Sequence, residues 1–313
     1  MTSSRPPFPT VLDSSLIAAW RACKRKGYLE YIEHWKTKGS NVHLHAGGAY
    51  AKGLEVARTT YYIDGKSEPE AHAAGLGALI HAYGDFECPP DSAKSLERMC
   101  GALEFYFDRY PMSTDKAIPA HLSGGRRGIE FSFAEPIDAD HPETGDPLLY
   151  VGRLDMLAEF QGGYWGEDDK TTSQLGASWP KQWDLRSQFI GYKWGVKASS
   201  NITLTGFLIR GVSILKTKYD TLQAIPYFPD WMVDEWYEQL MHDIVEMKWA
   251  WETGYWAPDL SGACTEYGGC PFRQICLSEP SARVNWLQNS YERRKWDPVT
   301  RTETRLLDGV VVR

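Results

Sequence analysis

The spacing of hydrophobic positions changes character near residue 128. Before it, residues 14–35 and 49–62 carry apolar side chains every three or four positions, which predicts two helices, the second opening after Gly47-Gly48. Residues 67–110 have the same helical spacing, with a break at the CPPD stretch. The first third of the chain is therefore expected to be helical, behind a flexible, proline-punctuated arm at residues 1–13.

After residue 128 the pattern becomes alternating and β-rich. The runs IEFSFAEPI, PLLYVGRLDMLAEF and YWGEDDKTT predict strands bounded by turn residues. A helix is expected in WDLRSQFIGYKWGVKA, one or two strands in NITLTGFLIRGVSILKT, and a long amphipathic helix in FPDWMVDEWYEQLMHDIVEMKWAWETG. Together these elements indicate an α/β fold: a mixed central sheet flanked by helices, with an N-terminal helical elaboration and a C-terminal cap.

Composition narrows the class of protein only slightly. A net charge of −7 argues against a general polycation, but an enzyme acting on nucleic acid needs only a local positive track. The N-terminus has no apolar signal region and no apolar run is long enough to span a membrane, so a cytoplasmic protein is expected. In a reducing compartment the six cysteines are not expected to form disulfides.

The stretch GRLDMLAEFQGGYWGEDDKTT at 152–172 is the most informative segment. If Gly162-Gly163 forms a two-residue turn, Asp155 faces Lys170 across the ladder. Because side chains alternate along a strand, Asp155, Asp168 and Lys170 then project from one face. This inference depends on the register of the hairpin.

Two converging carboxylates suit a hard cation such as Mg²⁺, and a neighbouring lysine can position a metal-bound water. The alternative is a surface hairpin with an Asp–Lys cross-strand pair of little consequence. Gln188 and Tyr192 follow on one face of the next helix, where they could bind a phosphate and stack on a base. Taken alone, such a pair is more often explained as half-buried core residues.

Three motifs together resemble the RecB-type branch of the PD-(D/E)xK nuclease superfamily, with its restriction-endonuclease-like core. This branch includes the AddB nuclease domain and the CRISPR-associated adaptation exonucleases. GRLD at 152–155 resembles the GxxD motif, DDKT at 168–171 the D-x-K-T motif, and QFIGY at 188–192 the Q-x-x-x-Y motif. Their order and approximate spacing also match.

The resemblance implies roles for individual residues. Asp155 and Asp168 would be metal ligands for Mg²⁺ or Mn²⁺, with the carbonyl of Asp169 a possible third. Lys170 would be the catalytic lysine, and Gln188 and Tyr192 would contact DNA.

The family's first motif, roughly G-x-x-x-H-x-x-L-E, matches the outline of GGAYAKGLE at 47–55, with one departure. Ala51 stands where the histidine ligand would be. Glu55 could reach the metal instead, as could His43 or His45, although a solvated helix carboxylate is the simpler explanation of Glu55. The departure leaves open a one-metal enzyme, a substituted ligand or lost activity.

The C-terminal segment CTEYGGCPFRQIC has a C-x5-C-x5-C pattern that lacks the paired C-x2-C steps usual for zinc. RecB-type nucleases with an iron–sulfur cluster share this layout, with one cysteine before the nuclease core and three after it. The resemblance implies a [4Fe–4S] cluster on Cys23, Cys264, Cys270 and Cys276. Structural zinc and free thiols remain the alternatives.

Basic residues in two places are candidates for contacts with phosphate. Lys24 and Arg25 follow Cys23 directly, so a cluster there would bring them close to DNA. Arg126 and Arg127 lie in the glycine-rich loop SGGRRG. A solvated surface is the alternative for each pair.

We therefore expect residues 14–280 to form a single nuclease domain, followed by a charged tail at 281–313. Within the domain we expect a helical part at 14–115, a catalytic sheet core at 128–216, and a helix with a cysteine cap at 229–280. The expected activity is metal-dependent exonuclease cleavage of single-stranded DNA or DNA ends.

Such an enzyme would serve recombination, repair or spacer-type DNA processing in a bacterial or phage-infected cell. One alternative is a catalytically inactive DNA-binding protein of the same fold. A second is a zinc-stapled scaffold for other proteins.

Overall fold

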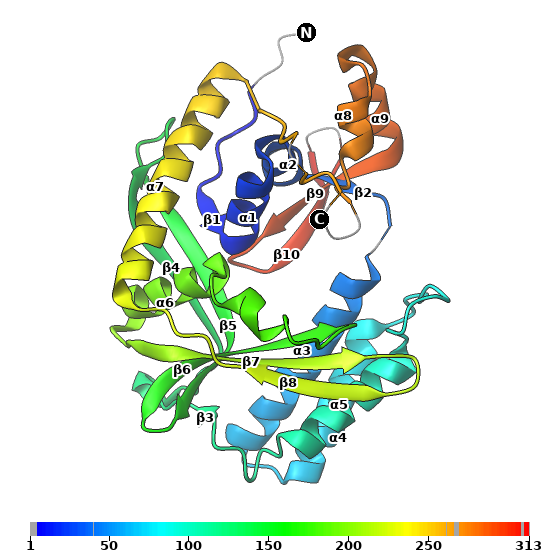
Figure 1. Cartoon of the computed structure of the whole chain (residues 1–313), viewed down its shortest axis with the longest axis vertical. Coiled ribbons are helices and arrows are strands. Elements are labelled where there is room, and N and C mark those ends of the chain that lie inside the picture. The colour runs from blue at the N-terminus through cyan, green and yellow to red at the C-terminus, as the bar shows by residue number, and fades with distance from the viewer. Residues whose placement is uncertain (1–4, 40, 261, 266–268, 308–309, 313) are drawn as a thin grey trace. The chain divides into compact units, whose positions relative to one another are not determined.

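Helices and strands follow one another in the order expected of an α/β protein (Figure 1). The computed structural model describes residues 5–39, 41–260, 262–265, 269–307 and 310–312. The chain divides into two compact units. The terminal unit comprises Met1–Gly39, Phe133–Gly152 and Asp230–Arg313, and the central unit comprises Ser40–Ser132 and Arg153–Pro229. The single domain expected at 14–280 stays a prediction.

The central unit is built on a mixed sheet. The strand order is β5, β6, β7, β8, with β3 pairing with β5 on its other edge, and β4 also pairs with β5. β5 and β6 are antiparallel, β6 and β7 are parallel, and β7 and β8 are antiparallel. The strands are β3 (Ile118–Pro119), β4 (Ile129–Asp140), β5 (Pro147–Phe160), β6 (Gly163–Thr172), β7 (Leu204–Ile214) and β8 (Tyr219–Ala224), with β4 and β5 contributing residues to both units.

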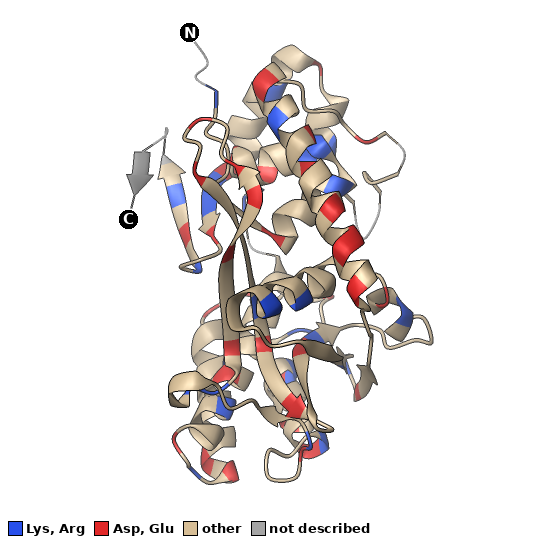
Figure 2. Ribbon diagram, turned by 90° about the vertical axis from the view of Figure 1, so that its left-hand side faces the viewer, with Lys and Arg blue, Asp and Glu red and all other residues tan. Residues whose placement is uncertain are grey.

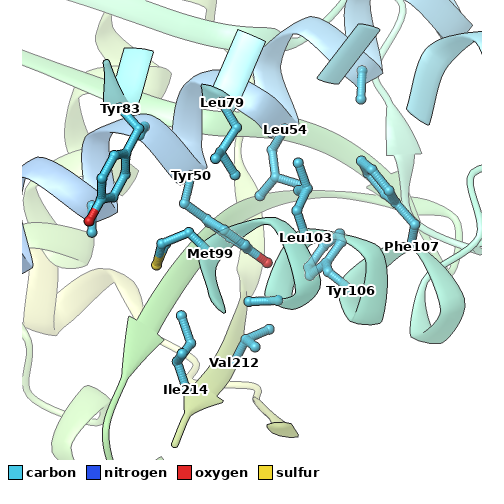
Figure 3. Close-up of a cluster of buried hydrophobic side chains, with 14 of the residues drawn as sticks. Tyr50, Leu54, Leu79, Tyr83, Met99, Leu103, Tyr106, Phe107, Val212 and Ile214 are labelled. Atoms are coloured by element: carbon cyan, nitrogen blue, oxygen red, sulfur yellow. The ribbon is translucent and has the colours of Figure 1, made fainter. Parts of the chain in front are cut away.

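Helices cover both faces of this sheet. Side chains of α3 (Val42–Tyr62), α4 (Glu68–Tyr83) and α5 (Leu96–Arg109) form a buried cluster with Val212 and Ile214 of β7 (Figure 3). On the opposite face, Phe189 of α6 (Ser187–Ser200) packs against Phe207, with ring centroids 5.1 Å apart. Because strand side chains alternate, β7 buries both of its faces.

The β5–β6 hairpin has the strands expected from the sequence, but its turn lies one residue earlier. Phe160 pairs with Gly163, so the two turn residues are Gln161 and Gly162, both with positive φ. The last pair is Met156 with Glu167, and Asp155 therefore does not face Lys170 as expected. The observed register therefore differs from the expected one by two residues. Because side chains alternate along a strand, a shift of two leaves every side chain on its predicted face.

Helix α3 begins at Val42, seven residues before the predicted start at Ala49. Asn41 caps it by accepting a hydrogen bond from the His43 amide, so the expected approach loop is the first helical turn. His45 lies on that turn, and its Nε2 is 2.8 Å from the Tyr83 carbonyl oxygen. Gly47 and Gly48 are accommodated inside the helix.

The terminal unit contains a parallel pair of β1 with β5 and a second, antiparallel sheet of order β11, β10, β9, β2. The described residues of the expected charged tail form helix α9 and strands β9, β10 and β11. The elements are β1 (Val11–Asp13), α1 (Ser14–Ala22), α2 (Lys24–Gly27), β2 (Trp35–Thr37), α7 (Asp230–Thr253), α8 (Arg273–Leu277), α9 (Arg283–Ser290), β9 (Tyr291–Asp297), β10 (Thr302–Leu307) and β11 (Val310–Val312).

The first predicted helix is broken at Cys23, which has an extended backbone with φ −166°. The chain then continues through α2 into a π-helical turn at Tyr28–Ile32. The break folds Gly27 back onto α1, where an added Cβ would lie 3.1 Å from the Trp20 Cα. Glycine permits this close approach.

The predicted flexible arm is anchored over residues 5–13, while residues 1–4 lie outside the described residues. Phe8 is 2% exposed and packs edge-on against Trp251 of α7. The Trp251 indole donates to the Pro6 carbonyl at 2.7 Å. Burial of the Phe8 ring therefore anchors the segment, although its prolines had suggested a flexible arm.

Charged residues of both signs are interspersed over the helices and strands on the face drawn in Figure 2. None of the helices in the described part of the chain has the length and hydropathy that a membrane span needs.

Candidate active site

The predicted catalytic residues meet on β5 and β6 of the central unit. Lys170 Nζ lies 2.5 Å from Asp168 Oδ2, and both residues occupy the same face of β6. Asp155 on β5 joins them because its Oδ2 accepts a hydrogen bond from the Asp169 amide at 2.9 Å. Two carboxylates and a lysine therefore converge at the open end of the hairpin.

Burial dominates the electrostatics of these groups. Asp168 is 4% exposed, and desolvation raises its pKa to about 7 despite the attraction of Lys170. The pKa of Asp155 is also raised by burial, with Lys170 opposing the shift and Asp169 adding to it. Burial lowers the pKa of Lys170, but Asp168 and Asp155 together raise it above its usual value, so the ammonium stays charged.

Helix α6 places the predicted DNA-contacting residues beside this lysine. The Gln188 side-chain amide donates to the Tyr192 hydroxyl at 3.0 Å. Lys170 Nζ lies 5.9 Å from the centre of the Phe189 ring. Burial is the largest cause of the raised Tyr192 pKa, and the charges of Asp168, Lys170 and Asp155 also act on it. Gln188 and Tyr192 therefore belong to the same site as the carboxylates.

The donor set fits a hard divalent cation. No three His, Cys, Asp or Glu side chains within the described ranges are arranged to hold one metal ion. Asp155 and Asp168 would thus supply two carboxylates, and backbone oxygen and water would complete the coordination. Mg²⁺ commonly binds in this way, keeping several waters. A cation would also offset the repulsion between two buried carboxylates.

The contacts of α3 show which face of the helix carries Ala51, the residue at the position of the expected histidine. Gly47, one turn earlier, faces β6, since an added Cβ would lie 3.9 Å from Thr171 Oγ1. Arg58, two turns later, bonds to Asp169 of the same strand. Position 51 therefore lies on the face of α3 that packs against β6. Glu55 is half-buried and pairs with Lys52 at 2.9 Å, while His43 is exposed.

A second set of buried charges lies on the other face of β6, and the sequence analysis missed it. Arg58 contacts Glu167 and Asp169, and Lys94 donates to Thr171 Oγ1 at 2.8 Å. A signal existed: Ala46, Tyr50, Leu54 and Arg58 recur every four residues, so an arginine continues the buried face of α3.

The four predicted cluster ligands gather in the terminal unit, where all are free thiols. The Asp259 amide donates to Cys23 Sγ at 3.3 Å, and Cys264 Sγ–H donates to the Asp259 carbonyl at 3.8 Å. Burial raises the Cys270 pKa, and the nearby Cys264 and Cys23 raise it further. Burial also raises the Tyr291 pKa, to which Cys270 and Cys276 both contribute. Four cysteines are the donor set that an iron–sulfur cluster takes, although no three of the described thiols are arranged here to hold one metal ion.

The basic residues predicted to contact phosphate differ in whether they are exposed or already bonded to other groups of the protein. Lys24 pairs with Glu246 at 2.7 Å, and Arg25 reaches both the Trp256 carbonyl and Cys276 Sγ. Arg127 bonds to the Pro119 carbonyl and lies against the His121 ring. Arg126, in contrast, is exposed.

No protein-family model and no curated protein sequence matches the chain. Among solved structures, the chain is similar to a candidate exonuclease from Eubacterium rectale, with 14% identity, a TM-score of 0.44, and coverage of 87% of this chain and 94% of that one. It is also similar to an alkaline exonuclease from Laribacter hongkongensis, with 13% identity, a TM-score of 0.24, and coverage of 66% and 94%. One fold hosts many activities, so this likeness does not assign a function.

Proposed function

We propose that this protein is a divalent-metal-dependent nuclease of the PD-(D/E)xK type that acts on DNA. One observation carries the proposal: Asp155, Asp168 and Lys170 converge on one face of a hairpin, beside Gln188 and Tyr192 of the next helix. Buried carboxylates paired with a charged lysine are costly to keep in a fold, and such groups cluster at functional sites.

In this proposal Asp155 and Asp168 hold Mg²⁺ or Mn²⁺, with the Asp169 carbonyl as a further ligand. When bound, such an ion would supply Lewis-acid chemistry, polarising a phosphoryl oxygen and lowering the pKa of a coordinated water. Lys170 orients the attacking water and offsets negative charge that develops on the phosphate. Gln188 and Tyr192 contact the DNA strand, and the exposed Arg126 is a further phosphate contact. Exonucleolytic cleavage of single strands or ends is the specific activity proposed.

A second function is a DNA-binding protein that keeps this fold without hydrolysis. Ala51 favours it, because the family's histidine ligand has no counterpart at that position. In a nuclease, by contrast, Asp155 and Asp168 would have to support catalysis without that histidine, with Glu55 as the further side chain that could bind the ion.

We also propose that Cys23, Cys264, Cys270 and Cys276 hold a [4Fe–4S] cluster, with zinc as the alternative occupant. The contacts of Cys23 and Cys264 with Asp259, and of Cys276 with Arg25, support a shared site.

The nuclease proposal is tested with end-labelled single- and double-stranded DNA, supplied with Mg²⁺, Mn²⁺ or EDTA. Lys170→Met keeps the length of the side chain and removes its charge, so metal-dependent cleavage should fall by roughly 100-fold or more. Lys197→Ala, on the exposed side of α6, is the matched control and should cleave like the wild type.

Degradation that resists EDTA, or that Lys170→Met leaves intact, would contradict the proposed site. If wild type and Lys170→Met both bind DNA and neither cuts it, the binding-protein function replaces the nuclease.

A further inference from the structure

A buried charge network lies on the face of β6 opposite Asp168 and Lys170. Arg58 of α3 is 5% exposed, and its Nη2 lies 2.5 Å from Glu167 Oε1, 2.8 Å from Asp169 Oδ2 and 2.8 Å from the Tyr106 hydroxyl. Burial lowers the Arg58 pKa, but its acidic and phenolic neighbours, Asp169 foremost, raise it well above the usual value. One charged guanidinium therefore binds both Glu167 and Asp169, whose side chains project from the same face of β6.

Asp169 connects this network to the proposed metal site. Its side chain is held by Arg58, and its amide donates to Asp155 Oδ2 at 2.9 Å. Its sequence neighbours are Asp168 and Lys170, whose side chains project from the other face. The orientation of one peptide unit thus depends on Arg58 on one side and sets the position of Asp155 on the other.

We propose that Arg58 is a positioning residue for the metal site, acting through Asp169 to orient the Asp155 carboxylate and the backbone of the catalytic strand. The inference rests on the proposed function and deepens it by naming a residue that touches neither metal nor DNA. Groups that orient metal ligands typically contribute 10–100-fold to metal affinity.

Arg210 of β7 provides a matched comparison within the same network. It is 4% exposed and bonds to Glu167, Tyr106 and, through two nitrogens, Asp115. Its described bonds do not include Asp169. Arg58 and Arg210 therefore share burial, charge and two partners. Arg210 also bonds to Asp115 and Gln223, and Arg58 makes the contact with Asp169 that the proposal invokes.

The experiment measures Mn²⁺ binding directly, without DNA, by the electron paramagnetic resonance signal of free Mn²⁺. The proteins are the full-length wild type, Arg58→Met and Arg210→Met, and a thermal melt of each metal-free protein reports stability separately. Arg58→Met should raise the Mn²⁺ Kd by about 10–100-fold. Arg210→Met should leave the Kd within about threefold of wild type, although both variants should melt earlier.

Asp169→Ala supplies a second route if Arg58→Met does not fold. It removes the acceptor of the Arg58 contact and keeps the backbone amide, so it should also weaken Mn²⁺ binding. Arg58→Lys keeps a charge but loses the fork of donors. The double variant Arg58→Lys/Asp169→Ala should weaken Mn²⁺ binding by less than the sum of the two single-variant effects.

Equal losses of Mn²⁺ affinity in the Arg58 and Arg210 variants would overturn the inference, because the network would then be only structural. Unchanged affinity in Arg58→Met and Asp169→Ala would do the same while leaving the nuclease proposal intact. A wild-type protein that binds no Mn²⁺ would instead remove the proposed function, and the role of Arg58 with it.

Discussion

At the scale of the residue, β6 concentrates buried acids and depends on cations to tolerate them. Burial raises the pKa of Asp168 and of Glu167 to about 7 each. Lys170 offsets Asp168 on one face, and Arg58 with Arg210 offsets Glu167 on the other. An unpaired buried charge costs several kcal/mol, so each of these cations is needed where it lies. A site built this way is expected to gain stability when a divalent cation binds.

His34 gives a prediction about pH at the same scale. Burial, followed by Lys295, Arg293 and Lys36, lowers its pKa from 6.5 to about 4. As the pH falls through 6.5 the unfolded chain takes up a proton that the folded protein refuses until about 4, so this residue makes stability fall across that window. His34→Asn, which tolerates the positive φ of 64°, should remove roughly 1–2 kcal/mol of that loss.

The measurement is urea unfolding at several values between pH 4 and 6.5. Exposed His81 on α4 is the control, and His81→Asn should follow the wild-type pH curve. Parallel curves for wild type and His34→Asn would show that His34 is not shielded from protons in the folded state.

At the scale of the element, α3 and α4 cross at a pair of glycines. An added Cβ on Gly75 would lie 2.7 Å from the Gly53 carbonyl and 2.9 Å from Ala57 Cβ. The close crossing lets α3 present Tyr50 and Leu54 to the core shown in Figure 3 and Arg58 to β6. The glycines thus fix where the helix lies on the sheet.

We expect Gly75→Ala to destabilise the protein by about 1–3 kcal/mol through overpacking. Gly77→Ala, on the same helix, meets nothing within 4 Å and should stabilise by about 0.5–1 kcal/mol through helix propensity. Free energies of unfolding from denaturant titration decide between them. If both alanines stabilise, the two helices can separate without cost and the crossing is not a constraint.

Local pattern predicted the elements well, and nonlocal contacts account for what it missed. The alternation in PLLYVGRLDMLAEF and the helical spacing before Cys23 depend on neighbours in sequence, so both elements appear in the structure. The break at Cys23 depends on Gly27 packing against Trp20. Gln161 occupies a turn position with positive φ that glycine would adopt more easily. The register of the two strands determines which residues form the turn.

The site divides in the same way. Asp155, Asp168, Lys170, Gln188 and Tyr192 could be proposed because motif spacing places them on adjoining elements, and the structure brings them together. The four-residue spacing of α3 marks Arg58 as buried but does not name its partners, and Arg210 lies on a strand that is buried on both faces. Their roles arise only when α3 and β7 pack beside β6, so sequence spacing alone could not connect them with Glu167.

At the scale of the whole molecule, the terminal unit is assembled from three separate segments. Cys23 belongs to the first, and Cys264, Cys270 and Cys276 belong to the last. A cluster bound by all four would join these segments and restrict the unfolded chain. The proposed cofactor would therefore stabilise the unit as well as occupy it.

Anaerobically purified protein should be brown, absorb near 400 nm and contain about four irons per chain. Cys23→Ser should lose most of this absorbance and iron and melt at a lower temperature, because one of four ligands is gone. Cys100→Ser is the control, since Cys100 packs against the helical core of the central unit. A colourless wild type that contains zinc would replace the cluster proposal with the zinc alternative.

The divided terminal unit also has a consequence in time. Roughly 250 residues separate Cys23 from Cys276. At about 5–20 residues per second, a ribosome needs on the order of 10–50 s to make the last thiol after the first has been made. The central unit has all of its residues by Pro229 and can fold during synthesis. The strands that carry Asp155, Asp168 and Lys170 would thus be in place before the thiols of the terminal unit can meet, and insertion of the proposed cofactor would come after them.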